Sequence, residues 1–378
     1  EPRMATRHII FLAWVLFALT SGCRSGRQIR DPEYAHLAQS TAAVSCAPGP
    51  AASAMAPLYA DLEGPHPVDD YVYFALGQNP EIQAARKRME AFAHQVPVAA
   101  SLQDPMLNMT VQPEPVQTAA GQQDFVLSAS QKFHWFGKLG TRACIAESQT
   151  NVARAQLAAS ELATVEKVKR AYYELYFIQQ AIAVTKAEQQ LLGEIRDVAN
   201  TRYTTGRASQ QDVLRADLEI SNTERELIRL RQQLESGQAR LARILHVSPQ
   251  TNVLPLEQLP PEQAPRDLDW LQRQAVAARP ELHAQLAAIE RDQLAADLAR
   301  LNYNPDVTLG MSWIDVSSAG ISPVANGQDS FLLTAGFNLP VYRKRLDSSV
   351  RSAEAKAVAS AREYDSLRDG TLEEVTDL

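Results

Sequence analysis

Histidine and cysteine, the residues best suited to metal binding and nucleophilic chemistry, are few in this chain and do not cluster. Its 378 residues include seven histidines, each standing alone, and three cysteines, Cys23, Cys46 and Cys144. A zinc site needs several His, Cys or carboxylate ligands at short spacings, and no such set occurs. The HExxH, GxSxG, Walker A and GxGxxG motifs are absent as well. We therefore expect no enzymatic activity, no metal ion and no cofactor, and we expect Cys144 to be a small buried residue of a long helix.

One cysteine stands where a specific modification is expected. A basic Arg7 precedes an apolar run over 9–19, which is too short to span a bilayer but suits a signal peptide. Small residues follow and lead directly into Cys23, a pattern that resembles a bacterial lipoprotein processing site. The resemblance implies cleavage after residues 1–22 and lipidation of the Cys23 thiol, and the Arg24 that follows implies the outer membrane. The alternative is an ordinary signal peptide that happens to contain a cysteine.

The overall composition favours helices and argues against nucleic acid. The chain has 37 Lys and Arg against 44 Asp and Glu, a net charge of −7. Nucleic-acid binding needs a clustered basic surface, which this acidic balance does not suggest. Hydrophobic residues make up 45% of the chain and aromatic residues only 7%. Such a mixture is typical of a mainly helical protein that buries apolar surface.

The elements that position these residues follow an internal repeat. Shifted by 200 residues, the segment 69–105 matches 269–305 both in the prolines that begin its elements and in several residues between them. Further along, the shift becomes 206, and the difference falls in one loop, 113–123 in the first copy and 314–330 in the second. Loops absorb such insertions. Matched pairs include Pro80/Pro280, Pro105/Pro305, Phe125/Phe331 and Lys138/Lys344.

Each copy contains one predicted β-hairpin, at 104–133 and at 305–340. Apolar and polar residues alternate along all four strands, over about 8–10 residues each. That length and pattern suit strands that are tilted across a bilayer around a wet lumen, although a half-buried soluble sheet would alternate in the same way. Four strands are too few to close a barrel, so a barrel would need several chains.

Two long helices are predicted after the first hairpin, over 138–201 and 209–245. At 1.5 Å per residue they would be roughly 95 and 55 Å long. The second carries a heptad seam, typical of helices packed side by side. Between them Gly206 supplies a turn, Ser209 a helix N-cap and Asp212 an acid for the first helical turn. The seam consists of Val213, Ile220, Leu227, Leu234 and Leu241, with Ala216, Thr223, Leu230 and Ile244 three places later.

The chain resembles the TolC-like outer-membrane efflux proteins. The resemblance combines the hairpin strands, the long helix pairs, the internal repeat and the lipidated N-terminus. The resemblance covers about 66–378, and the order and spacing of its pieces are more specific than any one piece. The pieces are Asn79-Pro80-Glu81-Ile82, Asp104-Pro105-Met106-Leu107, Phe133-His134-Trp135-Phe136-Gly137-Lys138-Leu139, Arg202-Tyr203-Thr204-Thr205-Gly206, Asp212-Val213-Leu214 and Arg279-Pro280-Glu281-Leu282.

The resemblance implies a mainly α fold with a membrane β-barrel. Long antiparallel coiled-coil helices would form a periplasmic α-barrel, and each chain would give two hairpins, or four strands, to a trimeric 12-stranded barrel. The implied function is the exit duct of a tripartite efflux pump, which passively exports drugs, metal ions or other small molecules. The implied partners are two further copies, a periplasmic adaptor, through it an inner-membrane transporter, and outer-membrane lipid, but no nucleic acid.

The resemblance also assigns roles to single residues. The tip residues Gly206, Arg207, Ala208 and Ser209 would contact the adaptor, and Asp212 would belong to the periplasmic gate. The barrel–helix junction would consist of Pro105, Trp135, Phe136, Gly137, Pro305 and Pro340. His134 stands where the family often has proline, which predicts a less rigid first bend; we expect it to be a plain junction residue rather than a metal or pH site.

These expectations divide the chain into a signal peptide at 1–22, a lipidated tether at 23–66, a first repeat at 67–247, a linker at 248–266 and a second repeat at 267–378. Under the shift of 206, residue 247 corresponds to position 453, so the second repeat is expected to be about 75 residues short.

Two rival functions stay open: a periplasmic adaptor, or membrane-fusion-type coiled-coil lipoprotein, and a type I secretion exit duct. Fold alone does not choose the substrate.

Overall fold

The computed structural model describes residues 62–259, 267–318, 320–321 and 327–377. Contacts group the chain into two units, Glu1–Ala56 and Pro57–Leu378, and every described residue belongs to the second. The signal peptide, Cys23, Cys46 and nearly all of the expected tether lie outside the described residues.

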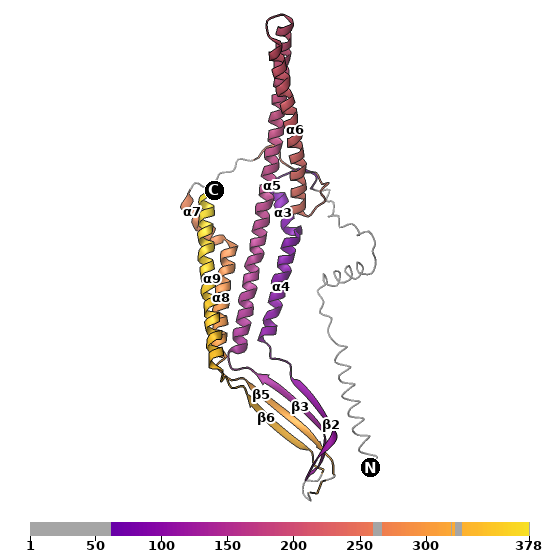
Figure 1. Cartoon of the computed structure of the whole chain (residues 1–378), viewed down its shortest axis with the longest axis vertical. Coiled ribbons are helices and arrows are strands. Elements are labelled where there is room, and N and C mark those ends of the chain that lie inside the picture. The colour runs from indigo at the N-terminus through magenta and orange to yellow at the C-terminus, as the bar shows by residue number, and fades with distance from the viewer. Residues whose placement is uncertain (1–61, 260–266, 319, 322–326, 378) are drawn as a thin grey trace. The chain divides into compact units, whose positions relative to one another are not determined.

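The described elements repeat in order, as the shift of about 200 residues predicts (Figure 1). Each repeat runs from a short helix through a longer helix and a β-hairpin into a long helix. The helices are α3 Val68–Gln78, α4 Pro80–Ala100, α5 Lys138–Thr204, α6 Gln210–Leu245, α7 Leu268–Ala278, α8 Pro280–Leu301 and α9 Arg343–Asp377. The strands are β1 Gly64–His66, β2 Met106–Thr118, β3 Gly121–Phe133, β4 Val253–Pro255, β5 Val307–Val316 and β6 Ser330–Phe337.

The α5–α6 pair is the longest feature of the fold. At 1.5 Å per residue, the 67 residues of α5 span roughly 100 Å and the 36 residues of α6 roughly 54 Å. α5 packs along α4, α6 and α8, so it contacts helices of both repeats. The predicted heptad seam of α6 is largely confirmed, because most of its positions are buried. These are Ala216, Thr223, Leu227, Leu230, Leu241 and Ile244.

A hydrophobic core forms where α3, α5, α6 and β4 meet. Tyr71 and Tyr172 are fully buried at its centre, with their rings 6.0 Å apart. The Tyr71 hydroxyl lies 3.1 Å from the Gly64 carbonyl and 3.0 Å from the Leu254 carbonyl, and it accepts a hydrogen bond from the Leu254 N–H. Burial raises the pKa of Tyr71 to about 12. These bonds tie a small parallel sheet, β1 with β4, to the helices.

That small sheet is a difference from the sequence-based expectation. Gly64–His66 falls in the segment expected to be a tether, and Val253–Pro255 in the segment expected to be a linker. Strands of three residues are too short for any alternation to be visible in sequence. A second correction concerns Cys144, whose side chain is exposed on α5 rather than buried.

The second sheet contains four antiparallel strands in the order β2-β3-β5-β6. The registers put the predicted apolar residues on one face, with Met109 beside Leu127, Leu127 beside Trp313 and Trp313 beside Phe331. The other face carries mostly Ser, Thr, Gly and Asn. In the described part of the chain, no helix packs along either face.

The first hairpin is longer than expected. The segment 113–123, expected to be a loop, is mostly strand, since β2 reaches Thr118 and β3 begins at Gly121. Pro113 and Pro115 suggested a loop because proline cannot donate to a strand ladder. β2 accommodates both because it is an edge strand of this sheet and because its register shifts between Val111 and Val116. None of the described helices combines the length and apolar character that crossing a membrane requires.

The Tyr71 hydroxyl provides a test of the core. We predict that Tyr71→Phe lowers the free energy of unfolding by about 1–2 kcal/mol, because the buried Leu254 N–H loses its acceptor. The matched control is Tyr73→Phe on the same helix, where the side chain is 84% exposed and little change is expected. Urea unfolding followed by circular dichroism measures both, and equal effects would contradict the assigned role.

Candidate functional site

The strongest polar site lies where the four-stranded sheet meets the helices. Asp306 stands between Pro305 and β5, and its side chain is only 9% exposed. Lys138, the first residue of α5, donates from Nζ to Asp306 Oδ1 at 2.7 Å and to the Asn304 carbonyl at 2.9 Å. The Lys138 side chain is 3% exposed. A buried ion pair therefore joins the first repeat to the second.

Three further groups complete the cluster around Asp306. The Trp135 N–H donates to Oδ1 at 3.1 Å, and Lys132 Nζ lies 3.2 Å from Oδ2. His134 Nδ1 is also 3.2 Å from Oδ2. The backbone of Asp306 is held as well, because its N–H donates to the Asn338 side chain and its carbonyl accepts from the Asn338 N–H at 3.3 Å. Asp306 thus joins the ends of β3, β5 and β6, through its carboxylate on the β3 side and its backbone on the β6 side.

The charge of Asp306 is well compensated. Burial acts to raise the pKa of this carboxyl, but the hydrogen bonds from Lys138, the Trp135 N–H, His134 and Lys132 outweigh it. The pKa of Asp306 consequently lies well below its usual range. The carboxylate stays ionised under ordinary conditions, so the cluster keeps its strength through mild acid.

His134 is part of this cluster rather than a plain junction residue. Its side chain is 3% exposed, and its Nε2 lies 3.1 Å from an Arg142 nitrogen. Arginine can only donate, so Nε2 must accept and Nδ1 must carry the hydrogen that is donated to Asp306. The hydrogen bonds hold the His134 ring at this bend, and the lower rigidity expected there without proline stays a prediction. Among the described residues, no group of three metal-ligating side chains occurs.

The other predicted junction residues lie around the same bend. Gly137 has φ of 87°, in the left-handed region that favours glycine, and this turn leads into α5. Trp135 and Phe136 pack edge to face, with Phe136 87% exposed. Pro105 directly precedes β2, Pro305 is separated from β5 by one residue, and Pro340 lies between β6 and α9. The structure brings Trp135, Gly137 and Pro305 together near Asp306, whereas Pro105 belongs to the opposite edge of the sheet.

The predicted tip lies at the other end of α5. Gly206 has φ of 72°, the Gly206 N–H donates to the Tyr203 carbonyl, and the Arg207 N–H donates to the Arg202 carbonyl. This pair of bonds is the Schellman motif, which ends a helix at a glycine. Of the predicted tip residues, Gly206, Arg207 and Ser209 are exposed and Ala208 is half-buried.

Asp212 has a structural partner in this tip. Its Oδ2 accepts from the Ser209 N–H at 3.3 Å, and the Ser209 hydroxyl accepts from the Gln211 N–H at 3.0 Å. Together they form a capping box at the start of α6. The helix-start role of Asp212 is therefore visible in one chain, and its gate role stays a prediction.

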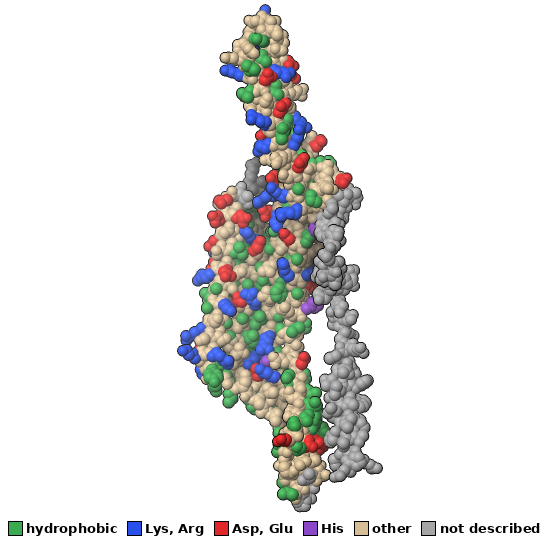
Figure 2. Space-filling model, turned by 45° about the vertical axis from the view of Figure 1, so that its right-hand side comes forward, with side chains coloured by type: hydrophobic (Ala, Val, Ile, Leu, Met, Phe, Trp, Pro, Cys, Tyr) green, Lys and Arg blue, Asp and Glu red, His purple; other side chains and the backbone are tan. Residues whose placement is uncertain are grey.

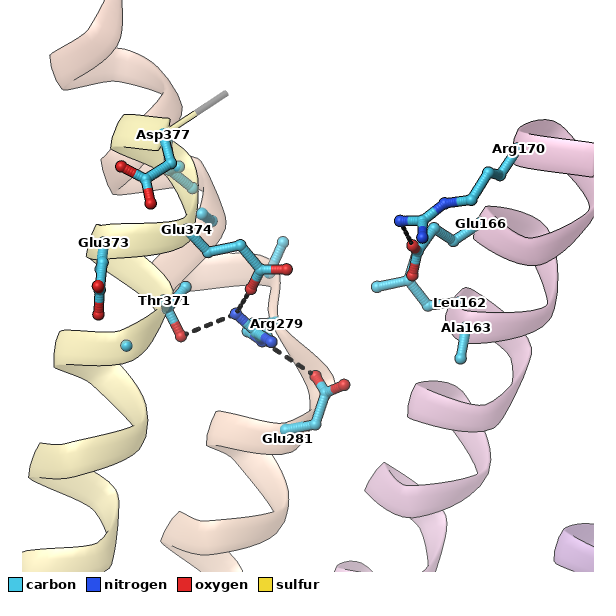
Figure 3. A pocket seen from close by; sticks show the side chains of 14 residues that line it. Leu162, Ala163, Glu166, Arg170, Arg279, Glu281, Thr371, Glu373, Glu374 and Asp377 are labelled. Carbon is cyan, nitrogen blue, oxygen red and sulfur yellow. Dashed lines mark hydrogen bonds and ion pairs between the residues drawn. The ribbon is translucent and has the colours of Figure 1, made fainter. Parts of the chain in front are cut away.

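A cavity of about 840 Å³ lies between α5 and the helices of the second repeat (Figure 3). On one side Arg279 donates to Thr371 at 3.1 Å and to Glu374 at 2.8 Å. On the α5 side, Arg170 pairs with Glu166. Asn79, the counterpart of Arg279, instead donates to the Ile244 carbonyl of α6 and caps α4. The two repeats therefore use different side chains to hold the start of their second helix to a long helix.

The apolar face of the four-stranded sheet is an exposed surface that no described helix covers. Leu333 is 83% exposed and Phe331 71% exposed, and the same face continues through Met109 and Met311. Figure 2 shows hydrophobic side chains along this end of the protein and Lys and Arg side chains where the helices meet the sheet. Water does not favour so continuous an apolar strip, so this face needs a cover.

Sequence reasoning missed Asp306, the central residue of the site. The sequence did contain a signal. The acidic Asp306 stands just before one predicted strand, and Lys132 and Lys138 stand near the end of another. Only the pairing of β3 with β5 shows that these ends meet, because Phe133 lies beside Val307.

Known proteins match this arrangement. Residues 72–246 match the family model described as outer membrane efflux protein. Nodulation protein T of Rhizobium leguminosarum bv. viciae is 25% identical over half of this chain and 40% of its own length. The pyoverdine export outer membrane protein OpmQ of Pseudomonas putida is 25% identical over 62% of this chain and 49% of its own. The chain spans about half the length of these curated relatives or less.

Solved structures agree with the fold. CusC superposes with a TM-score of 0.67 at 17% identity, over 88% of this chain and 81% of its own. VceC of Vibrio cholerae superposes with a TM-score of 0.65 at 20% identity, over 82% of this chain and 77% of its own. The fold is that of the TolC-like channels. The match over residues 72–246, together with this fold, makes the chain similar to outer membrane efflux proteins.

The ion pair at the junction can be tested by removing one partner. We predict that Asp306→Ala lowers the free energy of unfolding by about 3 kcal/mol, because Lys138 is left charged and buried. Asp306→Ala combined with Lys138→Met should recover part of the loss. The control is Asp365→Ala, which breaks an exposed pair with Arg362 and should cost less than about 1 kcal/mol.

The same variant has an expected pH signature. Because the pKa of Asp306 is lower in the folded state, its contribution is present above the unfolded pKa of about 4 and is lost as the pH falls through the folded value. Unfolding in urea at a series of pH values should therefore show a loss of stability below about pH 4 in the wild type. An identical loss in Asp306→Ala would contradict the assignment.

Proposed function

We propose that this chain is the outer-membrane exit duct of a tripartite efflux pump. It passively carries drugs, metal ions or other small molecules from the periplasm to the outside. Its proposed partners are two further copies of itself, a periplasmic adaptor and, through the adaptor, an inner-membrane transporter.

The observation that carries the proposal is the four-stranded sheet. All four strands turn most of their apolar side chains to one face, and no described helix covers that face. Lipid is the cover that such a face fits, since membrane barrels turn apolar residues to lipid and polar residues to a wet lumen. A periplasmic adaptor has no use for this face, which disfavours that rival.

The open edges of the sheet support assembly from several copies. β2 and β6 each have one edge that is unpaired among the described strands. Exposed edges are costly in lipid, where every backbone group needs a partner. Since each chain supplies an even number of alternating strands, successive copies can pair antiparallel and close a barrel; three copies would supply twelve.

The long helices suit the periplasmic part of a duct. They lead from the sheet to the exposed tip of Gly206, Arg207 and Ser209, where we propose that the adaptor binds. The Schellman motif and the capping box make this tip a rigid end rather than a loose loop. For Asp212 we retain the gate role as a proposal beside its capping role.

We predict that the full-length protein forms a heat-labile trimer in detergent and conducts ions in planar bilayers. Leu333→Lys should block insertion, because a charge on the lipid face costs about 2–4 kcal/mol near the membrane centre. Thr334→Lys is the matched control: it is the neighbouring residue, but it lies on the polar face. It should insert normally and change only the conductance. A soluble monomer without conductance would disprove the proposed function.

We further propose that Cys23 carries the lipid anchor. Cys23 and Cys46 lie outside the described residues. Cys23→Ser should abolish labelling by radioactive palmitate in a bacterial host, because the modified thiol is gone, whereas Cys46→Ser should leave the labelling unchanged. Labelled Cys23→Ser protein would reject the anchor without affecting the proposed duct.

A further inference from the structure

The pairing of β3 with β5 inside the chain offers a template for a contact between chains. β3 is the last strand of the first repeat and β5 is the first strand of the second. β6 and β2 of two different copies would be related in the same way, since β6 is the last strand of the second repeat and β2 is the first strand of the first repeat. Both have a free edge among the described strands. The internal junction is closed by Lys138 and Asp306, so the equivalent junction calls for an equivalent ion pair.

In the proposed barrel, β6 of one copy lies antiparallel beside β2 of the next copy. We propose that at this seam the basic triplet Arg343-Lys344-Arg345 at the start of α9 forms an ion pair with Asp104 of the next copy. This inference rests on the proposed trimeric duct and adds the residues that join its copies.

The charged residues next to the two edge strands are opposite in sign, and most of them form no ion pair with a described residue. Asp104 is exposed just before β2, and it forms no hydrogen bond or ion pair with any described residue. The side chains of Lys344 and Arg345 are exposed and likewise have no described partner, whereas Arg343 lies over the Tyr303 ring at 5.6 Å. The first turn of α9 contains no acid. Three bases there oppose one another and the helix dipole, so a carboxylate from another chain would relieve both.

The positions agree with the internal template. Lys344 is the counterpart of Lys138 under the shift of 206. Asp306 directly precedes β5, and Asp104 stands one residue further from β2, a difference of roughly 3.4 Å along an extended chain. The first junction uses one buried lysine, whereas this one offers three adjacent basic side chains. One of the three can reach a carboxylate that is displaced by this distance.

The faces of the two edge strands also match. On β6, Leu333, Ala335 and Phe337 lie on the apolar face, and on β2 Met109 and Val111 do. Pairing that keeps these residues on one side continues the apolar face from copy to copy. A slip by one residue would turn the apolar side chains of one copy into the lumen, so the face of each pair is strongly specified.

The ion pair is tested by charge reversal in the full chain. Asp104→Lys should lower the temperature at which the trimer dissociates in semi-native electrophoresis, and Lys344→Glu with Arg345→Glu should do the same. Combining all three changes should restore the dissociation temperature toward that of the wild type. The control combines Asp104→Lys with Lys356→Glu, an exposed base further along α9, and should restore nothing.

The strand pairing is tested by cysteine cross-linking in outer membranes, in a Cys46→Ser, Cys144→Ser background. Ala335→Cys should form disulfide-linked dimers and trimers when combined with Val111→Cys or Met109→Cys on the same face. Ala335→Cys combined with Thr110→Cys, on the opposite face, should not.

The outcomes separate this inference from the proposed function. A wild-type chain that forms no trimer would reject both. A conducting trimer without same-face cross-links, or without rescue by the triple reversal, would reject the inference alone. Lys344→Glu with Arg345→Glu could instead reduce membrane insertion equally with and without Asp104→Lys. That result would mean that the basic triplet binds lipid headgroups, and it would reject the ion pair.

Discussion

The four-stranded sheet cannot stay as it is in water, and much of the molecule depends on that constraint. Its apolar face runs unbroken across four strands, and two strand edges have no partner among the described residues. In the proposed duct, a lipid bilayer would cover the face and further copies would pair the edges. The long helices then carry the polar interior of the sheet onward, which a duct requires.

The junction between sheet and helices needs more than a covalent turn. Asp306 and Lys138 are both nearly buried, and each alone would be unfavourable there. Their contact works because Trp135, His134 and Lys132 satisfy the remaining oxygen positions. The result is that the end of β3, the start of β5 and the start of α5 keep one relative position, so the direction of a 67-residue helix is set at its first residue.

The tip shows the opposite solution, in which local sequence is sufficient. Gly206 ends α5 and Ser209 with Asp212 begins α6, through bonds between residues at most five positions apart. Such a turn keeps its form whatever lies around it. An exposed and rigid end is suited to contact another protein, because little ordering is required on binding.

The sequence by itself determined the features that depend on local periodicity. Alternation gave the four strands and their faces, heptads gave the α5–α6 pairing, and turn chemistry gave Gly206 and Ser209. Tertiary structure decided what depends on contacts between distant segments. Asp306 became the central residue only because β3 pairs with β5, His134 became buried because Arg142 and Asp306 flank it, and β1 and β4 form only because Tyr71 and Tyr172 bind their backbones. Turns and periodic faces depend on neighbours along the chain and can be read from the sequence, whereas partners far apart along the chain are selected by the free energy of the whole fold.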